Sequence, residues 1–211
     1  MIRFKAREDA RIATANEPES RIDDPVVHGS PGVRKILSAL EGETATRILD
    51  LGPAVPSNIT TLSDFAGHIR VSDAADDLCA PIAEDDDWTA ISRAAALLPA
   101  ETGEFDLVLA WDILNYLRKD VSEALVDRLR QRCQPGARIF ALIHEGPTMP
   151  AVPQVFEIRA DDRLAYRCST QEQLASPKLT PAEVERRLEG FRIEASFVLQ
   201  HGIREYVAIR V

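Results

Sequence analysis

The stretch that decides the fold is the C-terminal one, "FRIEASFVLQHGIREYVAIRV", residues 191–211. Two apolar segments flank His201 and Gly202, and this pattern predicts two strands joined by a tight turn. A turn as tight as this one makes its two strands antiparallel. In a sheet whose other strands are parallel, the last strand therefore runs against its neighbours.

The segments before this hairpin predict the parallel part of the sheet. Short, almost continuously apolar segments alternate with helical patterns, and they read "RILDLG" (47–52), "HIRVSD" (68–73), "EFDLVLAW" (104–111) and "RIFALIH" (138–144). Such strands are typical of parallel sheets that carry helices on both faces. We therefore expect an α/β fold, doubly wound around a mostly parallel seven-stranded sheet whose last strand is antiparallel.

Two of the expected helices carry clear start patterns. Ser30 precedes Pro31 and an apolar stripe, so it is expected to cap a helix that begins at residue 31. Thr180, Pro181 and Glu183 form the pattern of a capping box. These patterns predict where the two helices start.

Two segments are additional to this sheet. Residues 154–168, "QVFEIRADDRLAYRC", alternate in polarity on both sides of Asp161 and Asp162 and predict an inserted β-hairpin. We expect this hairpin either to cover a binding pocket or to pair with a second chain through an exposed edge, which gives a homodimer. Residues 1–27 are polar and non-periodic, so we expect a flexible N-terminal arm ahead of one domain at 28–211.

Composition and charge exclude several kinds of partner. The chain has 211 residues, a formal net charge of −9 and no cluster of Lys and Arg, so we expect no nucleic-acid partner. No apolar run is long enough for a bilayer, and the charged N-terminus lacks a signal-peptide core, so we expect no membrane partner. Cys79, Cys133 and Cys168 are too few and too scattered for a disulfide framework or a metal site. We therefore expect a cytoplasmic protein without a bound metal.

Four further segments, together with the reversed last strand, form a pattern that is specific for one type of fold. They are "ILDLGPA" (48–54), "IRVSD" (69–73), "FDLVLAWDILNYL" (105–117) and "RCQPGARIFAL" (132–142). With these segments the chain resembles the class I S-adenosylmethionine (SAM)-dependent methyltransferases over roughly its last 180 residues. The resemblance implies a Rossmann-like fold, SAM as the cofactor and transfer of a methyl group to an acceptor.

The resemblance places the cofactor turn directly after the first strand. Family members show acid-any-Gly-any-Gly-any-Gly there, and this chain has Asp50, Gly52, Ala54 and Pro56 at those positions. Asp50, Gly52, Pro53 and Ala54 are therefore expected to bind the methionine end of the cofactor, although Pro56 removes one N–H donor. Asp50 has an alternative role, in which it bonds only the backbone N–H groups of the turn.

Three more cofactor contacts follow from the resemblance. Asn58 is expected either to supply a replacement hydrogen bond or to cap the next helix. Asp73 ends the second strand, where a carboxylate can accept both ribose hydroxyls, and its alternative is an exposed loop acid. Leu98 belongs to the adenine-facing segment, in which Ala94 replaces the acid of the family.

The ends of the fourth and fifth strands supply the candidate catalytic residues. His144 is the candidate base, because open parallel sheets bind ligands beyond the carboxyl ends of their strands. Asp112 is the second catalytic candidate, with a helix cap as its alternative, and Trp111 is expected to contact the cofactor. The acceptor is expected to contact the other polar side chains near these ends: Asn115, Tyr116 and Glu145.

The residues after the fourth strand also bear on the acceptor. They lack a "PPY"-type signature for amide or base-amino groups, so we expect a small-molecule acceptor. The sequence therefore predicts a SAM-dependent methyltransferase for an unidentified small molecule. The alternative, favoured by Ala54, Pro56 and Ala94, is a methyltransferase-fold module that binds a ligand or partner without catalysis. A dinucleotide or nucleotide-sugar enzyme is a third reading, but the dinucleotide glycine pattern matches only at Gly52.

Overall fold

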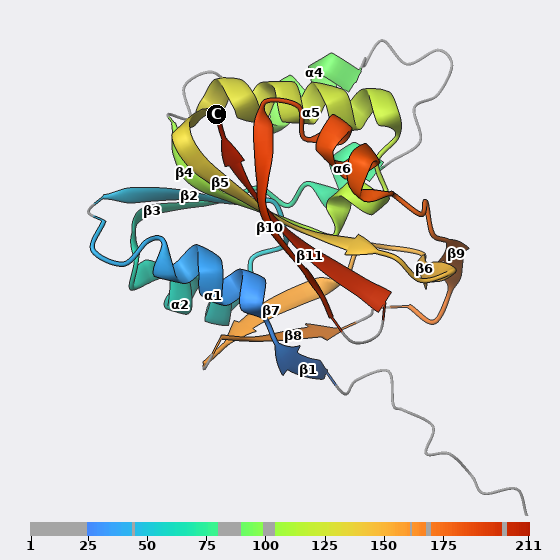
Figure 1. Ribbon diagram of the computed structural model, residues 1–211, viewed down its shortest axis with the longest axis horizontal. Helices are drawn as coiled ribbons and strands as arrows, with labels where there is room; N and C mark the ends of the chain where they lie inside the picture. The colour runs from blue at the N-terminus through green and yellow to red at the C-terminus, as the bar shows by residue number, and fades with distance from the viewer. Residues whose placement is uncertain are drawn as a thin grey trace, which may run out of the picture.

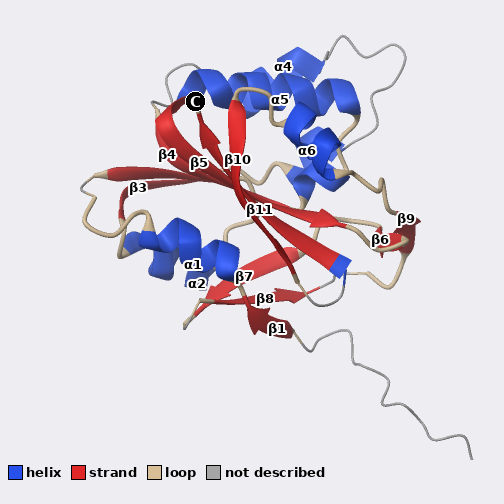
Figure 2. Ribbon diagram, in the orientation of Figure 1, coloured by secondary structure: helices blue, strands red, loops and turns tan. Residues whose placement is uncertain are grey.

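The structure is a computed structural model that describes residues 25–43, 45–79, 90–98, 104–160, 162–167, 170–199 and 202–211. A twisted central sheet carries helices on both faces, and a smaller sheet lies beside one of the two helical layers (Figure 1; Figure 2). The predicted α/β architecture is confirmed in these residues.

The parallel part of the central sheet consists of four adjacent strands. In spatial order they are β3 (Ala66–Val71), β2 (Thr46–Asp50), β4 (Phe105–Trp111) and β5 (Cys133–His144). Each neighbouring pair is parallel. Their carboxyl ends therefore meet at one edge of the sheet, which brings together residues that are far apart in the sequence.

The antiparallel part of the sheet lies beyond β5. There β11 (Ile203–Arg210) pairs antiparallel with β5 on one side and with β10 (Phe191–Val198) on the other. The reversed last strand predicted from the C-terminal stretch is confirmed. Of the turn between these strands, Gly202 has a positive φ of 74°, whereas His201 lies outside the described residues.

The number of strands differs from the prediction. The central sheet has six strands in the described residues, and the predicted seventh is not among them. Between β3 and β4 the described residues form the helices α3 (Ala75–Cys79) and α4 (Ala90–Leu97). The sequence of α4, "AISRAAAL", is rich in alanine, the residue with the highest helix propensity, which accounts for a helix at this place.

Helices on the two faces of the sheet bury separate apolar cores. One face is covered by α1 (Pro31–Ser38) and α2 (Pro56–Ser63), and the other by α4, α5 (Lys119–Arg132) and α6 (Pro181–Arg187) (Figure 1). The two cores are distinct clusters of buried side chains. Removal of this apolar surface from water supplies the main stabilising free energy of such a fold.

Both predicted helix starts are confirmed. Ser30 is the N-cap of α1, and its Oγ accepts a hydrogen bond from Val33 N at 3.1 Å. Thr180 and Glu183 form the reciprocal bonds of a capping box at the start of α6.

A three-stranded sheet with the order β1-β8-β7 lies beside α2. Within the predicted hairpin region, β7 (Val155–Arg159) pairs antiparallel with β8 (Arg163–Arg167), and β1 (Val26–Gly29) pairs with the other edge of β8. Val26 and Val27 thus belong to a strand and not to the predicted arm, because their β-branched side chains suit a pleated strand. Residues 1–24 of that arm lie outside the described residues.

The remaining elements bear on other expectations. A short pair of strands, β6 (Thr148–Pro150) and β9 (Gln173–Ala175), lies outside both larger sheets. Cys133 is buried, Cys79 is half-buried, and Cys168 lies outside the described residues. The described part of the chain contains no cluster of His, Cys, Asp and Glu able to hold a metal ion. Among its helices, none combines the length and the apolar character needed to cross a membrane.

Candidate active site

The carboxyl end of β2 leads into the turn predicted to bind a cofactor. Asp50 is 1% exposed, and its Oδ1 accepts hydrogen bonds from Gly52 N at 2.9 Å and from Trp111 Nε1 at 2.6 Å. Burial raises the pKa of Asp50 above 3.8, and the charge of Asp73 adds to the rise, whereas the two hydrogen bonds oppose it. Asp50 therefore organises the turn from inside the protein, as in the alternative role considered for it.

Trp111 covers this turn from the end of β4. Its ring lies so close to Gly52 that a Cβ atom on that glycine would be 2.7 Å from Trp111 Cδ1. The indole stacks on Phe156 of β7, with ring centroids 5.5 Å apart and 6° between the ring planes, and meets Phe140 edge-on. The indole of Trp111 is therefore packed between Asp50 and two aromatic side chains in this structure, and its contact with a cofactor stays a prediction.

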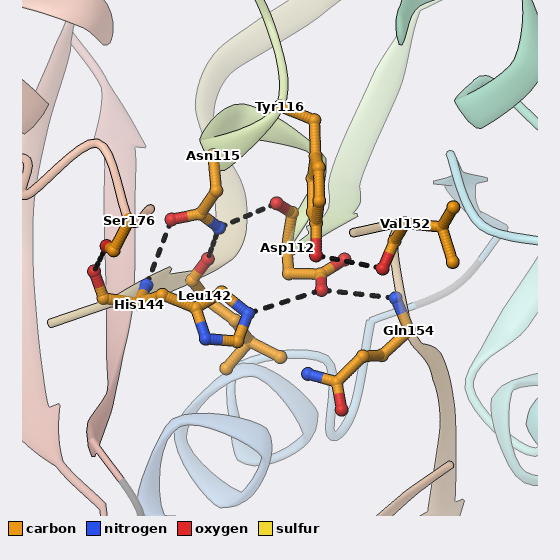
Figure 3. Close-up of polar contacts among 8 residues, drawn as sticks. All are labelled: Asp112, Asn115, Tyr116, Leu142, His144, Val152, Gln154 and Ser176. Carbon is orange, nitrogen blue, oxygen red and sulfur yellow. Dashed lines mark hydrogen bonds and ion pairs between the residues drawn. The ribbon is translucent and has the colours of Figure 1, made fainter. Parts of the chain in front are cut away.

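A buried acid–histidine pair joins the ends of β4 and β5 (Figure 3). Asp112 is 1% exposed and His144 is 5% exposed, and Asp112 Oδ2 lies 3.5 Å from His144 Nε2. Gln154 N donates a hydrogen bond to the same Oδ2 at 3.2 Å. Asp112 occupies the N-cap position of the 3₁₀ turn Ile113–Asn115, but its side chain makes no capping hydrogen bond there. The sheet thus brings together the two residues that the sequence nominates for catalysis.

The Asp112–His144 pair is buried, and some of its polar atoms have no hydrogen-bond partner among the residues that the structure describes. Burial raises the pKa of Asp112 above 3.8, while the neighbouring His144 ring and the hydrogen bond from the backbone N–H of Gln154 oppose the rise. Asp112 Oδ1 and His144 Nε2 are buried without a hydrogen-bond partner in the described residues. His144 Nδ1, on the other side of the ring, makes no hydrogen bond within the described part of the chain and is not among these buried atoms. Nε2 therefore faces the carboxylate, and Nδ1 is the nitrogen available to a ligand.

Asn115 fixes the two members of the pair relative to each other. Its Nδ2 donates to Asp112 O at 2.6 Å and to Leu142 O at 2.8 Å, and its Oδ1 accepts from His144 N at 2.9 Å. Because both polar atoms of the amide are used inside the protein, Asn115 is not free to contact an acceptor. The predicted substrate contact is corrected to a supporting one.

Glu145 and Tyr116 also have protein partners. Glu145 Oε1 accepts a hydrogen bond from Arg204 Nε at 2.5 Å, and this ion pair compensates its charge. This ion pair connects β11 to the end of β5, and the acceptor contact of the exposed Glu145 stays a prediction. Tyr116 is half-buried, and its OH donates to Val152 O at 2.9 Å, in the loop that leads to Gln154 (Figure 3).

Gln154 is the site residue that sequence reasoning does not reveal. It is 6% exposed, its backbone binds Asp112, and its side chain extends on the His144 side of that carboxylate in Figure 3. A polar residue at the start of a predicted hairpin gives no local indication of such a role. The one indication in the sequence is the expectation that this hairpin covers a binding pocket, because Gln154 is its first residue.

Asn58 holds helix α2 against β7. Its Nδ2 donates to Phe156 O at 2.9 Å, and its Oδ1 accepts from Ile158 N at 2.7 Å. Neither predicted role is found, because the amide is used by β7 and the N-cap of α2 is Val55. The cofactor contact predicted for Asn58 is therefore corrected to a structural bond.

The bonds of Asn58 also bear on the predicted homodimer. They occupy the outer edge of β7 at Phe156 and Ile158, while β1 occupies the second edge of β8. Pairing of two chains through the hairpin region stays a prediction, and the open edge of this sheet belongs to β1.

Replacement of Asn58 by alanine is expected to lower the unfolding free energy by about 2–4 kcal/mol, because two buried backbone groups of β7 lose their partners. Urea unfolding measures this loss. Thr60→Ala is the matched control, because Thr60 lies on the same helix with an exposed hydroxyl bonded to Pro56 O, and it should change the free energy by less than about 0.5 kcal/mol. Equal effects of the two substitutions would contradict the role of Asn58.

Comparisons with known proteins concern the fold. No family model matches this sequence, and no curated protein does. A SAM-dependent methyltransferase from Mesorhizobium loti is 17% identical, with 85% of this chain and 98% of that chain covered and a TM-score of 0.49. The N-methyltransferase NodS from Bradyrhizobium japonicum WM9, in complex with S-adenosyl-L-homocysteine (SAH), is 15% identical over 93% of each chain, with a TM-score of 0.47. The pyocyanin biosynthetic protein PhzM is 15% identical with a TM-score of 0.46 over 85% of this chain, which spans about half (54%) of PhzM.

The topology of the central sheet decides the type of fold. β3, β2, β4 and β5 are parallel, and β11 lies antiparallel between β5 and β10. This is the arrangement that the sequence resemblance implies. The chain therefore has the Rossmann-like strand order that the resemblance to class I methyltransferases implies. In open α/β sheets of this kind, ligands bind at the carboxyl edge of the sheet, where Asp112 and His144 lie.

Of the two remaining residues predicted to bind the cofactor, Asp73 is exposed and Leu98 is buried. Asp73 follows β3 with an exposed side chain, close enough to Asp50 for its charge to raise the pKa of that residue. Leu98 is 0% exposed, and Ala94 is 1% exposed, both in the core beneath α5. The side chain of Leu98 therefore packs in the core and does not face a ligand, which corrects its predicted contact with the cofactor.

Proposed function

We propose that the protein is a SAM-dependent methyltransferase that acts on a small-molecule acceptor with a hydroxyl group. The observation that carries the proposal is the buried Asp112–His144 pair at the carboxyl edge of the sheet. A histidine held by a buried carboxylate is well suited to accept a proton from a hydroxyl group. The methyltransferase fold and the turn that starts at Asp50 support SAM as the cofactor.

The turn after β2 fits the two polar ends of SAM. Asp73 presents an exposed carboxylate, which suits the ribose hydroxyls. Helix α2 begins without a side-chain cap, and Ser57 Oγ in its first turn is buried without a hydrogen-bond partner in the described residues. A helix N-terminus with free donors suits a carboxylate such as that of the methionine part. Pro53 is half-buried and Ala54 is exposed, and both precede helix α2 in the turn after β2.

The chemistry required of the protein is limited. SAM supplies a methyl group that is already activated on a sulfonium. The protein has to align the acceptor, exclude water and remove the proton of the hydroxyl group. In this proposal His144 Nδ1 takes that proton, Asp112 orients the ring through Nε2, and Asn115 fixes the backbone N–H of His144.

One observation favours a second function, a methyltransferase-fold module that binds a ligand or partner without catalysis. Trp111 covers Gly52 and occupies Asp50 Oδ1, so the glycine that should let a ligand approach instead admits a side chain of the protein. Binding of SAH distinguishes the two functions directly, since a module without a cofactor site does not bind it.

Isothermal titration with SAH tests the proposed function. Binding in the micromolar range is expected, and Asp73→Ala should weaken it about 10- to 100-fold, because the ribose hydroxyls lose a charged acceptor. Asp64→Ala is the matched control, since Asp64 is an exposed acid at the far end of α2 and should leave the affinity unchanged. Absence of binding at millimolar SAH would exclude the enzyme and leave the binding module.

A further inference from the structure

Trp111 has a strained backbone. Its φ is +47°, in the left-handed region that bulky residues rarely adopt. The register between β4 and β5 also shifts between Leu109 and Trp111, so the strand is irregular at this point. A conformation of this kind costs about 1–3 kcal/mol and persists only where surrounding contacts hold it. Strain of this kind occurs preferentially at functional sites.

Three contacts hold the indole in place. Trp111 Nε1 donates to the buried Asp50 Oδ1 at 2.6 Å. One face of the ring stacks on Phe156, and Phe140 meets it edge-on with ring centroids 5.9 Å apart. The hydrogen bond is the directional member of the set, and because its acceptor is a carboxylate it is stronger than a bond between neutral groups.

The indole fills the space next to Gly52. A Cβ on Gly52 would lie 2.7 Å from Trp111 Cδ1 and 2.8 Å from Trp111 Nε1, both within the range that real Cβ atoms essentially never show. A glycine in a binding turn lets a ligand approach the backbone closely. Here the indole of Trp111 occupies the space next to Gly52. The same indole donates a hydrogen bond to the carboxylate of Asp50, at the start of the turn.

We propose that Trp111 is a gate, whose indole closes the methionine end of the SAM site and moves away from Asp50 when the cofactor binds. This inference rests on the proposed function. Opening removes one of the two hydrogen bonds that Asp50 Oδ1 accepts, the other being from Gly52 N, and so lets this oxygen bind a cationic group of the ligand. Because Phe156 belongs to β7, the small sheet β1-β8-β7 stabilises the closed position.

A closed gate makes the apparent affinity for SAH depend on the fraction of open molecules. Trp111→Phe keeps an aromatic ring but removes the N–H that binds Asp50, so it should raise the open fraction and tighten SAH binding about tenfold. Isothermal titration measures this change. Tyr166→Phe is the matched control, because Tyr166 touches Phe156 but not Asp50, and the affinity should not change.

Fluorescence gives a second readout. The chain has two tryptophans, so Trp88→Phe leaves Trp111 as the only reporter. SAH should shift its emission to longer wavelength, since the indole leaves an apolar place. Binding of SAH to the Trp88→Phe protein with no change in emission, or equal or weaker binding after Trp111→Phe, overturns the gate and leaves the proposed function intact. Absence of SAH binding in all of these proteins overturns both.

Discussion

His144→Ala is expected to slow methyl transfer by a factor of about 10²–10⁴, the usual contribution of a general base. The substitution removes the nitrogen that takes the proton of the acceptor, while the turn at Asp50 and the carboxylate of Asp73 stay in place. The affinity for SAH should therefore change little. The rate is measured as SAH formed from SAM with a panel of small phenols and hydroxy acids, on the acceptor that the wild-type protein turns over fastest.

Two variants separate catalysis from stability in this experiment. His68→Ala removes an exposed histidine of β3 and should leave the rate unchanged. Asp112→Asn keeps the size of the side chain but removes the charge that orients the ring, so it should lower kcat and leave the affinity for SAH unaltered. Wild-type turnover in the His144→Ala protein would show that His144 is a structural residue, and the proton would then go to water or to another group.

The fold and the proximity of Asp112 and His144 could be predicted from the sequence, because both follow from local rules. The tight turn before Ile203 dictates an antiparallel last strand, whatever the rest of the chain does. Asp112 and His144 each end an apolar strand, and parallel neighbours necessarily place such ends together. Strand order thus predicts that the two residues are neighbours, whereas the 3.5 Å between their side chains also depends on the bonds of Asn115 and Gln154.

The contacts of Asn58 and Trp111 could not be predicted from the sequence, because their partners are distant along the chain. Asn58 bonds β7 about a hundred residues away, and the indole of Trp111 packs against Phe140 and Phe156. No local pattern distinguishes an amide that binds a cofactor from one that binds a strand. The prediction of a seventh strand had no apolar segment to support it between β3 and β4. The described residues there form the helices α3 and α4.

Glu205 is a buried acid on the otherwise largely apolar strand β11, and the sequence pattern gives no indication that its side chain is buried. It lies on β11 with 0% exposure, and its carboxylate accepts hydrogen bonds from Ser30 Oγ and, at 2.7 Å, from Gly32 N. Ser30 also caps α1, so the carboxylate connects the start of α1 to the reversed strand of the sheet. A Cβ on Gly32 would lie 2.9 Å from the Glu205 carboxylate and 2.7 Å from Phe140, so the contact leaves no room for a larger residue.

Glu205→Ala is expected to lower the unfolding free energy by about 2–5 kcal/mol, because it leaves a cavity and two buried donors without an acceptor. Glu205→Gln is the matched variant. Its amide oxygen can still accept from Gly32 N, and its NH₂ can donate to Ser30 Oγ, so the loss should be smaller. Urea unfolding at a fixed pH measures both, and an alanine variant as stable as the glutamine variant would contradict the role of the carboxylate.

The pH dependence of stability tests the ionisation of Glu205. Burial raises the pKa of Glu205 above 4.5, and the bonds from Ser30 and Gly32 oppose this rise without cancelling it. A group whose pKa is higher in the folded state contributes stability that is complete below its unfolded pKa and is lost as the pH rises through the folded pKa. The wild-type protein should therefore lose stability relative to Glu205→Gln as the pH increases from 4.5, and the difference should stop growing once the folded protein is ionised. Parallel profiles of the two proteins over this range would mean that Ser30, Gly32 and the N-terminus of α1 compensate the buried charge in full.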